Sequence, residues 1–486
     1  MLFNSYAFIF AFFPVAVIGY FLLGKYQGGR LSNAWLVMAS LFFYGYWNVR
    51  YLPLLVGSIA VNYLIAGEIV KAQSISGEKR GGRAFFAFGL IFNLGLLCFY
   101  KYTDFIIKNI DRLFQLDIPL TGITLPLGIS FFSITQIVFL VGAYFYGEGK
   151  KERSFINYAL FVSFFPHLIA GPILYHKQMM KQFRNEKLRH PNVENIARGI
   201  ALFVIGLFKK VVIADKFIAP VAAGFDNAAG LAMLDGWTVA ICYALELYYD
   251  FSGYSDMAVG MSKIMNIDIP INFSAPFRAD SLIEFWNRWH ISLTTTITAY
   301  IYTPLVRMKK EASFAWTMFA TVITMFIIGV WHGAGWTYAL NGVLQGVGLC
   351  VNHIWRRMGL KMPVALAHIT TVIFAVVSVV LFRAASVHQA MDLYRAMLGR
   401  HGGIHLPVEW MPDHLTVFLT HSPFQYMPSP WVVIVAVLLI AFCPDSNTLV
   451  KKYFRADIKW AVALAAMFVF SVLHFSQVTV FLYSQF

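Results

Sequence analysis

The feature that most constrains this chain is a series of apolar runs, each about 20 residues long, that recurs along the whole sequence. A helix of roughly that length spans the hydrocarbon core of a bilayer, which is about 30 Å thick. Only 13% of the residues are charged and 59% are hydrophobic, whereas a soluble domain carries about a quarter charged residues. We therefore expect an all-α, polytopic integral membrane protein.

Several of the apolar runs are short or interrupted by glycine and proline, as around Pro166, Gly171 and Pro172, and such runs are typical of re-entrant segments. We therefore predict about 11–14 membrane or re-entrant helices. No internal repeat is found, so one domain over residues 1–486 is the simplest organisation. The candidate segments are residues 5–24, 31–47, 52–70, 84–100, 120–146, 155–175, 194–214, 231–249, 290–306, 312–331, 334–354, 364–382, 430–443 and 460–483.

The charged residues predict how the chain is oriented. Lys and Arg total 38 against 24 Asp and Glu, for a formal charge of +14. The excess falls mainly in short connections, which the positive-inside rule places in the cytoplasm. The 401–429 connection has no Lys or Arg and is expected outside, as is the C-terminus; the 155–220 region has basic residues on both sides of a segment and stays open. The basic connections are 71–83, 150–153, 307–310, 356–361 and 451–459.

Cysteine and loop histidine patterns give no metal site. The four cysteines, Cys98, Cys242, Cys350 and Cys443, are widely separated and are interpreted as small buried hydrophobic residues. The histidines of the 401–429 connection have no carboxylate or cysteine partners at ligand spacing, and we interpret that stretch as an ordinary outer loop; they are His401, His405, His414 and His421. The N-terminal run lacks a preceding basic region and is expected to be a retained helix.

Ionisable residues inside apolar segments cost a few kcal/mol each, so they are candidates for function. Three carboxylates, Glu246, Asp250 and Asp256, crowd the first such cluster, together with Tyr249 and Ser252. The cluster indicates either a polar cavity wall or a buried hydrogen-bond network that fixes helix packing. For any single residue of this cluster, a role in helix packing is the preferred interpretation. For the cluster as a whole, a cavity wall is preferred. Two glycines, at 253 and 260, predict close backbone approach or a helix break.

A second cluster precedes an apolar run and reads FWNRWHISL from residue 285. On a helix, Asn287 and His290 are three residues apart and share a face with Glu284. The tryptophans of this stretch, Trp286 and Trp289, are also typical of an interfacial anchor at headgroup level. That alternative explains the tryptophans better than it explains Asn287 and His290.

A third cluster contains His332, which alone among the histidines is flanked by two long apolar segments. Trp331 precedes it, Gly333 and Gly335 follow, and Asn341 lies further on, a pattern that favours a broken helix lining a cavity. A neutral imidazole has the right proton affinity to deprotonate a hydroxyl near pH 7. Packing against a carbonyl is the alternative. The sequence contains no nucleophile elbow, P-loop or dinucleotide fingerprint.

At these clusters the sequence resembles the membrane-bound O-acyltransferase (MBOAT) family, and in particular its alginate O-acetylation subfamily. The resemblance covers nearly the whole chain and follows the family order. It implies an all-helical ring around a central tunnel, with a catalytic core of roughly 155–355. The stretches that carry it are MLFNSYAFIFAFFPV, SFFPHLIAGPI, YYDFSGYSDMA, FWNRWHISL and GVWHGAGW.

The resemblance also implies roles. His332 would be the base that deprotonates the acceptor hydroxyl, or would orient a thioester. His290 and Asn287 would position the donor or stabilise an oxyanion. The other residues expected to position donor or acceptor are Trp331, Asp250, Tyr249, Ser252 and Asn341.

The resemblance further implies a reaction scheme in the bacterial inner membrane. Acetyl-CoA or an acyl-carrier thioester would be the acyl donor, with no permanently bound cofactor and no metal. A periplasmic SGNH-hydrolase-type partner would help to modify an extracytoplasmic polysaccharide such as alginate or another exopolysaccharide, with peptidoglycan or cellulose as alternatives. A non-catalytic glycan or lipid transporter is a competing hypothesis, although no inverted repeat supports it.

Overall fold

The computed structural model describes residues 1–27, 29–76, 81–147, 154–400 and 428–475, and this part of the chain is helical. Its only extended pairing is an isolated bridge between Phe273 and Trp289. The expectation of an all-α protein is confirmed. The histidines at 401, 405, 414 and 421, the 150–153 connection and the last residues of the 460–483 segment lie outside the described residues.

The α-helices of the first half are α1 (Phe13–Gln27), α2 (Gly29–Trp47), α3 (Leu52–Ser76), α4 (Arg83–Leu97), α5 (Thr103–Phe114), α6 (Ile129–Tyr146), α7 (Phe155–Ser163), α8 (Phe165–Leu168), α9 (His176–Phe183), α10 (Val193–Phe208) and α11 (Ile218–Asp226). Those of the second half are α12 (Met233–Ile264), α13 (Leu282–Arg288), α14 (Ile291–Ile297), α15 (Thr303–Arg307), α16 (Phe314–His332), α17 (Trp336–Arg357), α18 (Val364–Arg383), α19 (Val387–Met397), α21 (Pro430–Phe442), α22 (Ser446–Lys452) and α23 (Ile458–Leu473).

Four short π-helical turns occur within or beside these helices: η1 (Phe8–Phe12), η3 (Cys98–Tyr102), η6 (Lys209–Ile213) and η10 (Thr298–Tyr302). Such turns widen the helix by one residue and often lie at functional positions. Two of them carry lysines inside apolar helices, Lys101 in η3 and Lys210 in η6.

Six helices in the described residues are long and apolar enough to cross a membrane, or seven if the bent pair α21 and α22 forms one span. The chain is therefore a multi-pass membrane protein. Of the 11–14 membrane or re-entrant helices predicted, six or seven are therefore long enough for full spans, and the apolar runs at 155–175 and 290–306 fold into short, broken helices. The six are Phe8–Tyr26, Val49–Ser76, Arg83–Phe114, Ile129–Tyr146, Phe314–His332 and Val364–Arg383.

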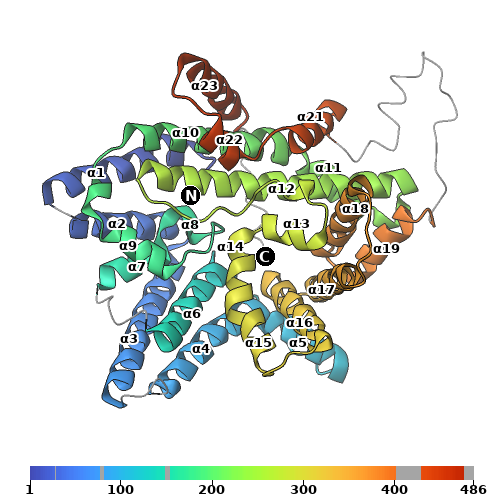
Figure 1. The fold of residues 1–486 in the computed structure, drawn as a ribbon, viewed down its shortest axis with the longest axis horizontal. Helices are drawn as coiled ribbons and strands as arrows, with labels where there is room; N and C mark the ends of the chain where they lie inside the picture. Colours follow the sequence, from blue (N-terminus) through green and yellow to red (C-terminus); the bar gives the residue numbers. More distant parts are fainter. Residues whose placement is uncertain (28, 77–80, 148–153, 401–427, 476–486) are drawn as a thin grey trace.

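The long helix α12 lies lengthwise across the molecule with α10 packed along it (Figure 1). Glycines at 199 and 206 on α10 meet glycines at 260 and 253 on α12. A Cβ on Gly253 would lie 2.7 Å from the carbonyl oxygen of Gly206, and one on Gly206 would lie 2.5 Å from that of Gly253. The predicted close approach is confirmed, and α12 runs through both glycines without a break.

Two broken segments meet in the interior. The first is α7 and α8, which are separated by a turn at Phe164 and followed by an irregular, buried stretch to Leu174. The second is α13 and α14, which are separated by Trp289 and His290. The N–H of Ile173 donates to the hydroxyl of Ser292 at 2.9 Å and joins the two. This arrangement fits re-entrant segments, as expected for 155–175.

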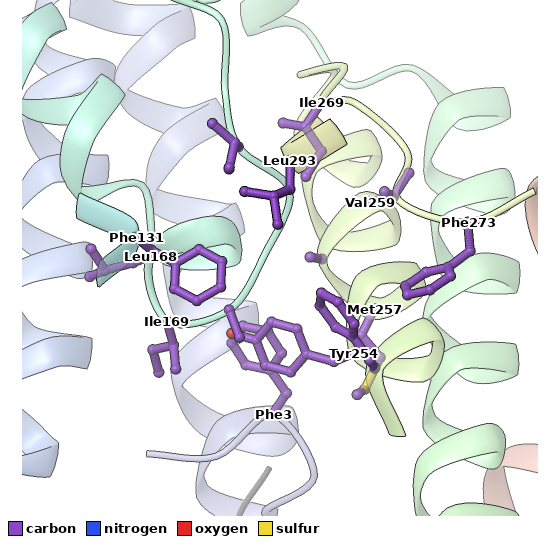
Figure 2. Packing of buried hydrophobic residues seen from close by; sticks show 14 of the residues in the cluster. Phe3, Phe131, Leu168, Ile169, Tyr254, Met257, Val259, Ile269, Phe273 and Leu293 are labelled. Carbon is purple, nitrogen blue, oxygen red and sulfur yellow. The ribbon is translucent and has the colours of Figure 1, made fainter. Parts of the chain in front are cut away.

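The core that surrounds this meeting point is built from distant parts of the chain (Figure 2). Phe3 stacks on Tyr254 of α12, with ring centroids 4.7 Å apart. Side chains of α6, of the α8 region and of α14 gather around this stack; among them are Phe131, Leu168 and Leu293.

Helices α16 and α17 form a tight hairpin beside α18. Its close packing depends on glycines, because a Cβ on Gly329 would lie 2.3 Å from the carbonyl oxygen of Tyr338, and one on Gly342 would lie 2.4 Å from that of Met325. The turn of the hairpin is residues 333–335, with Gly333 and Gly335 both extended. The predicted helix break after His332 is confirmed.

Candidate active site

His332 is the last residue of α16, and a lysine from another helix holds the backbone there. The ammonium of Lys101 donates to the carbonyl oxygens of Trp331 at 2.6 Å and His332 at 3.0 Å, and to the hydroxyl of Ser130 at 3.1 Å. The hydroxyl of Tyr102 donates to the carbonyl of Val330 at 2.7 Å. A cation suits this place because the last carbonyls of a helix lack intrahelical donors and carry partial negative charge.

The imidazole of His332 is buried, with 7% of the residue exposed. Two aromatic rings meet it edge to face, Trp331 with centroids 5.1 Å apart and Phe382 of α18 at 5.2 Å. These contacts hold the ring without surrounding it completely, because His332 also lines a cavity. The buried, aromatic-walled position expected for a reactive histidine is therefore present.

The cavity beside His332 has a volume of about 50 Å³, enough for a few water molecules. Its wall is mostly apolar and aromatic, with a few polar side chains that converge on it. Asn341 lines it, and no group in the described residues hydrogen-bonds to its Oδ1 atom. The lining comes from α12, α13, α16, α17 and α18, and includes Leu247, Trp286, Ile328, Gln345 and Ser378.

A short polar chain crosses the cavity wall. The indole N–H of Trp286 donates to Gln345 Oε1 at 3.1 Å, and Gln345 Nε2 donates to the hydroxyl of Ser378 at 2.8 Å. Trp289 is buried in an aromatic cluster, stacked on Phe285 at 5.6 Å. Trp289 is buried and Trp286 is half-buried against the cavity; the alternative that they anchor the chain at the headgroup level stays a prediction.

A second cavity, of about 300 Å³, is lined by Gly333 and Ala334, the residues that follow His332. Lys101 and Tyr338 also line it, and the ring of Tyr338 lies over Gly333, where a Cβ would come within 2.2 Å of it. Part of the wall comes from the connection between α5 and α6, at residues 121, 123 and 125. That connection is at the opposite end of α4 and α5 from the basic 71–83 segment, so this cavity is on the side expected to be outside.

His290 is buried to 1% exposure and adopts a left-handed backbone conformation, with φ of 45°. Its ring meets Phe251 of α12 edge to face at 4.7 Å, and its Nδ1 atom is 3.3 Å from Oδ1 of Asn272. It is not among the residues that line the His332 cavity, and the role expected for His290 beside His332 stays a prediction.

Asn287 lies in α13, whereas His290 lies outside that helix, directly before α14. Helix α13 ends at Arg288, and the chain is extended at Trp289 before the left-handed His290. The helical spacing that should place Asn287, His290 and Glu284 on one face is therefore broken, and that prediction is wrong. Asn287 is exposed, and its expected role at the donor stays a prediction.

Glu284 forms a salt bridge with Arg288 and accepts the N–H of Asp280 at 3.0 Å. Partial burial acts to raise the pKa of its carboxyl, but the Asp280 N–H and the Arg288 guanidinium outweigh that effect, and the pKa is lowered. Glu284 is therefore held as a carboxylate in an ion pair.

Asp250 and Asp256 of α12 face the lysines of η6 and do not line the His332 cavity. Asp250 Oδ1 is 2.5 Å from the ammonium of Lys210, which also pairs with Asp215 at 2.8 Å. Asp256 pairs with Lys209 at 2.7 Å. These contacts fit the packing interpretation of the cluster.

Two further residues of that cluster, expected to position donor or acceptor, also have other contacts. The hydroxyl of Tyr249 donates to the carbonyl of Ala436 at 2.6 Å, and Ser252 is buried 3.5 Å from Lys209. Tyr249 does line a cavity, of about 240 Å³, but that cavity is formed with α21, α22 and α23. The structure therefore brings none of Asp250, Tyr249 and Ser252 to the His332 cavity, where α12 contributes Ala244 and Leu247 instead.

The described residues contain no group of three or more histidine, cysteine or carboxylate side chains able to hold a metal ion. All four cysteines are free, but Cys98 and Cys443 are exposed. Their predicted burial is wrong, because an apolar segment in a membrane can place a small hydrophobic residue on its outer surface.

Sequence reasoning missed Lys101, Asn272 and Gln345. Lys101 has a local signal, since a lysine in the middle of an apolar run of 32 residues is unusual. Asn272 lies in an irregular stretch, and its contacts with His290 and Ser292 are 18 and 20 residues away. Nothing in its neighbourhood distinguishes it from an ordinary loop asparagine.

The fold and the site together define a class: helical, multi-pass membrane proteins with a buried histidine at a helix break beside an internal cavity. Comparison with known proteins identifies the family. Residues 136–388 match the model of MBOAT, the membrane-bound O-acyltransferase family, and the chain belongs to it. It is therefore a membrane O-acyltransferase.

Three of the similar proteins are named for peptidoglycan, alginate and teichoic acid. The chain is 37% identical to a peptidoglycan O-acetyltransferase of Helicobacter pylori over 100% of this chain and 98% of that protein. It is 35% identical to a probable alginate O-acetylase of Pseudomonas putida over 82% of this chain and 80% of that protein. It is 30% identical to a teichoic acid D-alanyltransferase of Streptococcus thermophilus over 43% of this chain and 52% of that protein.

Proposed function

We propose that this protein passes acetyl groups from a cytoplasmic thioester to the outer side of the bacterial cytoplasmic membrane, for O-acetylation of peptidoglycan. The choice of polymer rests on the similarity to a peptidoglycan O-acetyltransferase, which runs through the full length of both chains. The similarity to a probable alginate O-acetylase leaves about a fifth of the chain unmatched. The proposal therefore prefers peptidoglycan, the alternative of the sequence analysis, to alginate.

The observation that carries the proposal is the position of His332. Its side chain lines one cavity, and the two residues after it line a second cavity, on the side that the positive-inside rule predicts to be outside. A group that travels through the protein from the cytoplasmic side to the outer side would pass this imidazole. A tunnel of this kind, inside a ring of helices, would let the acyl group cross while its carrier stays behind.

The chemistry needs one base. The imidazole of His332 takes the proton of the acceptor hydroxyl, and the oxygen attacks the thioester carbonyl. The C–O bond forms, the C–S bond breaks, and the proton passes from the imidazole to the departing thiolate. A base of this kind contributes about 10²–10⁴-fold to the rate. The apolar walls exclude water that would hydrolyse the thioester.

The donor in this scheme is acetyl-CoA or an acyl-carrier thioester, and neither needs to stay bound between turnovers. An SGNH-hydrolase-type partner outside the membrane would pass the acetyl group to the glycan. Asn341 and Trp331 would position substrate in this scheme; in support, Asn341 lines the His332 cavity, and Asn341 Oδ1 and the indole N–H of Trp331 are buried without a hydrogen-bond partner in the described residues. Polar groups in this state are available to a ligand.

Transfer of labelled acetyl by the purified protein, reconstituted with its outer partner, tests the proposal. We expect His332→Ala to lower the rate by about 10²–10⁴-fold, with the thermal midpoint unchanged. His388→Ala is the matched control, because that histidine is 83% exposed and pairs only with a carboxylate on its own helix. If the His332→Ala variant transfers acetyl at the full rate, His332 is not the catalytic base.

The acceptor is tested separately in cells. Deleting the gene should remove O-acetyl groups from isolated muropeptides and leave those on secreted polysaccharide unchanged. The opposite result would favour an exopolysaccharide acceptor and leave the role of His332 intact.

A further inference from the structure

We propose that Asn272 is a positioning residue that fixes the tautomer of His290, so that the ring carries its proton on Nδ1 and offers Nε2 as a proton acceptor. This inference rests on the proposed function, because it assigns His290 a part in that reaction. Asn272 is fully buried, and it lies in the irregular stretch between α12 and α13, outside the three sequence clusters that suggested the site.

The orientation of the Asn272 amide follows from its neighbours. The backbone N–H of Ser292 points to one terminal atom of the amide at 3.3 Å, and the hydroxyl of Ser292 points to the same atom at 2.6 Å. A backbone N–H can only donate, so that terminal atom must be the oxygen, Oδ1, and not the nitrogen. The Ser292 hydroxyl already accepts the N–H of Ile173 at 2.9 Å, so its own hydrogen is available to Oδ1.

The tautomer of His290 follows from that orientation. Its Nδ1 atom lies 3.3 Å from the same oxygen. A carbonyl oxygen can only accept, so Nδ1 must carry a hydrogen. In the neutral ring the lone pair is then on Nε2, and this nitrogen is the atom at which the ring gains or loses a proton.

Asn272 also holds the backbone at this point. Its carbonyl oxygen accepts the N–H of Ile291 at 3.0 Å, immediately after His290. A left-handed conformation at a residue other than glycine costs about 1–3 kcal/mol unless its surroundings fix it. Contacts through both its main chain and its side chain make Asn272 the residue that fixes His290.

This tautomer changes the role that His290 can have in the reaction. A neutral ring with its hydrogen on Nδ1 cannot donate from Nε2 to a developing oxyanion, which is one of the roles that the family resemblance suggests for His290. It can accept a proton at Nε2, such as the proton of the acceptor hydroxyl. His290 then acts as a second base.

Three variants separate these effects. Asn272→Leu keeps the size of the side chain but removes the acceptor, so we expect a mixture of His290 tautomers and a fall in kcat of about 10–100-fold, as when a metal-ligating histidine loses the partner that orients it. The KM for the acyl donor should stay the same. Asn272→Asp keeps the acceptor oxygen and should retain the tautomer. Ser292→Ala keeps the contact between Asn272 and His290 and serves as the matched control.

The tautomer is read by solid-state NMR of the full protein in lipid with ¹⁵N-labelled histidine rings, and a His290→Gln sample assigns the signals. In the unaltered protein we expect a protonated Nδ1 and an unprotonated Nε2 for His290. The opposite tautomer there would overturn the proposal, even if the Asn272 variants did not fold. An unchanged tautomer with unchanged kcat in folded Asn272→Leu would do the same. Neither result depends on the outcome for His332→Ala, which tests the proposed function.

Discussion

The crossing of α10 with α12 and the hairpin of α16 with α17 are packed in the same way but treat buried polar groups differently. Both bring backbones together through glycines whose Cβ atoms would collide with the opposing helix. At the crossing, Asp250 and Asp256 are each paired with a lysine. At the hairpin, Asn341 Oδ1 is buried beside a cavity and has no partner among the described residues.

This difference shows how to separate structural from functional polar residues in a membrane protein. A buried charge that finds its counter-charge fixes two helices together, and removing one partner leaves the other unpaired in an apolar medium. A buried polar atom without a partner at a cavity has its hydrogen-bonding capacity left for a ligand. The first kind should affect stability, and the second should affect the rate.

The largest effect is expected from Lys210→Met at the crossing. This change leaves Asp250 and Asp215 buried together without their cation, so we expect a loss of about 3–5 kcal/mol in stability. The thermal midpoint in detergent and the yield of folded protein measure it. Lys71→Met is the control, because its ion pair with Glu68 is exposed and is worth about 0–1 kcal/mol. If Lys210→Met keeps normal stability but loses acetyl transfer, the crossing of α10 with α12 has a role in the reaction and not only in packing.

Lys101→Met tests the hairpin of α16 with α17, where Lys101 holds the end of α16. The change removes the donor from the carbonyls of Trp331 and His332, and a displacement of about 1 Å at a reactive group can lower the rate by about 10²-fold. We expect that loss in kcat with folding retained. Lys108→Met, on the same span and exposed, should behave as the unaltered protein. If Lys101→Met transfers normally, the contact serves assembly alone.

Gly253→Ala sharpens the packing part of the comparison. The new methyl group would lie 2.7 Å from the carbonyl oxygen of Gly206 and 3.1 Å from the backbone nitrogen of Lys210, so we expect a loss of about 1–3 kcal/mol in thermal stability. In α3, Gly57 has open space where its Cβ would be, and Gly57→Ala should be neutral or stabilising by up to about 1 kcal/mol. Equal midpoints for the two variants would contradict the packing seen at the crossing.

The smallest effect is expected from Tyr249→Phe. The change removes the hydrogen bond to Ala436 and should lower stability by about 0.5–1.5 kcal/mol. Because Tyr249 lies away from the His332 cavity, transfer per folded molecule should not change. A fall in kcat would restore Tyr249 to the substrate-positioning role that the sequence analysis gave it.

The parts of the structure that follow from local sequence are the parts that could be predicted. The apolar runs predict the membrane spans, and the glycines after His332 predict the helix break. The glycine at 253 predicts the close approach of α10 to α12. Partner choice is a long-range property. Asp250 looks the same in the sequence whether it lines a cavity or pairs with Lys210, which is 40 positions earlier in the chain.

The position predicted for Asn287 is wrong for a local reason, whereas the partners of Asp250 depend on residues far away in the sequence. Its spacing from His290 fits a helix, but Trp289 enters an aromatic cluster with Phe285 and Phe273 and draws the chain into an extended conformation. The packing of one large ring decides the geometry there, and helical periodicity does not.

The contact of Lys101 with the end of α16 sets an order of events during synthesis. The ribosome makes the two partners 230 residues apart, and at about 5–20 residues per second the lysine waits for tens of seconds before its carbonyl acceptors emerge. During that interval its span must be stabilised by something other than the finished protein, such as water at the translocon or a temporary neighbour. The contact between Lys101 and the end of α16 therefore forms only after α16 has entered the membrane.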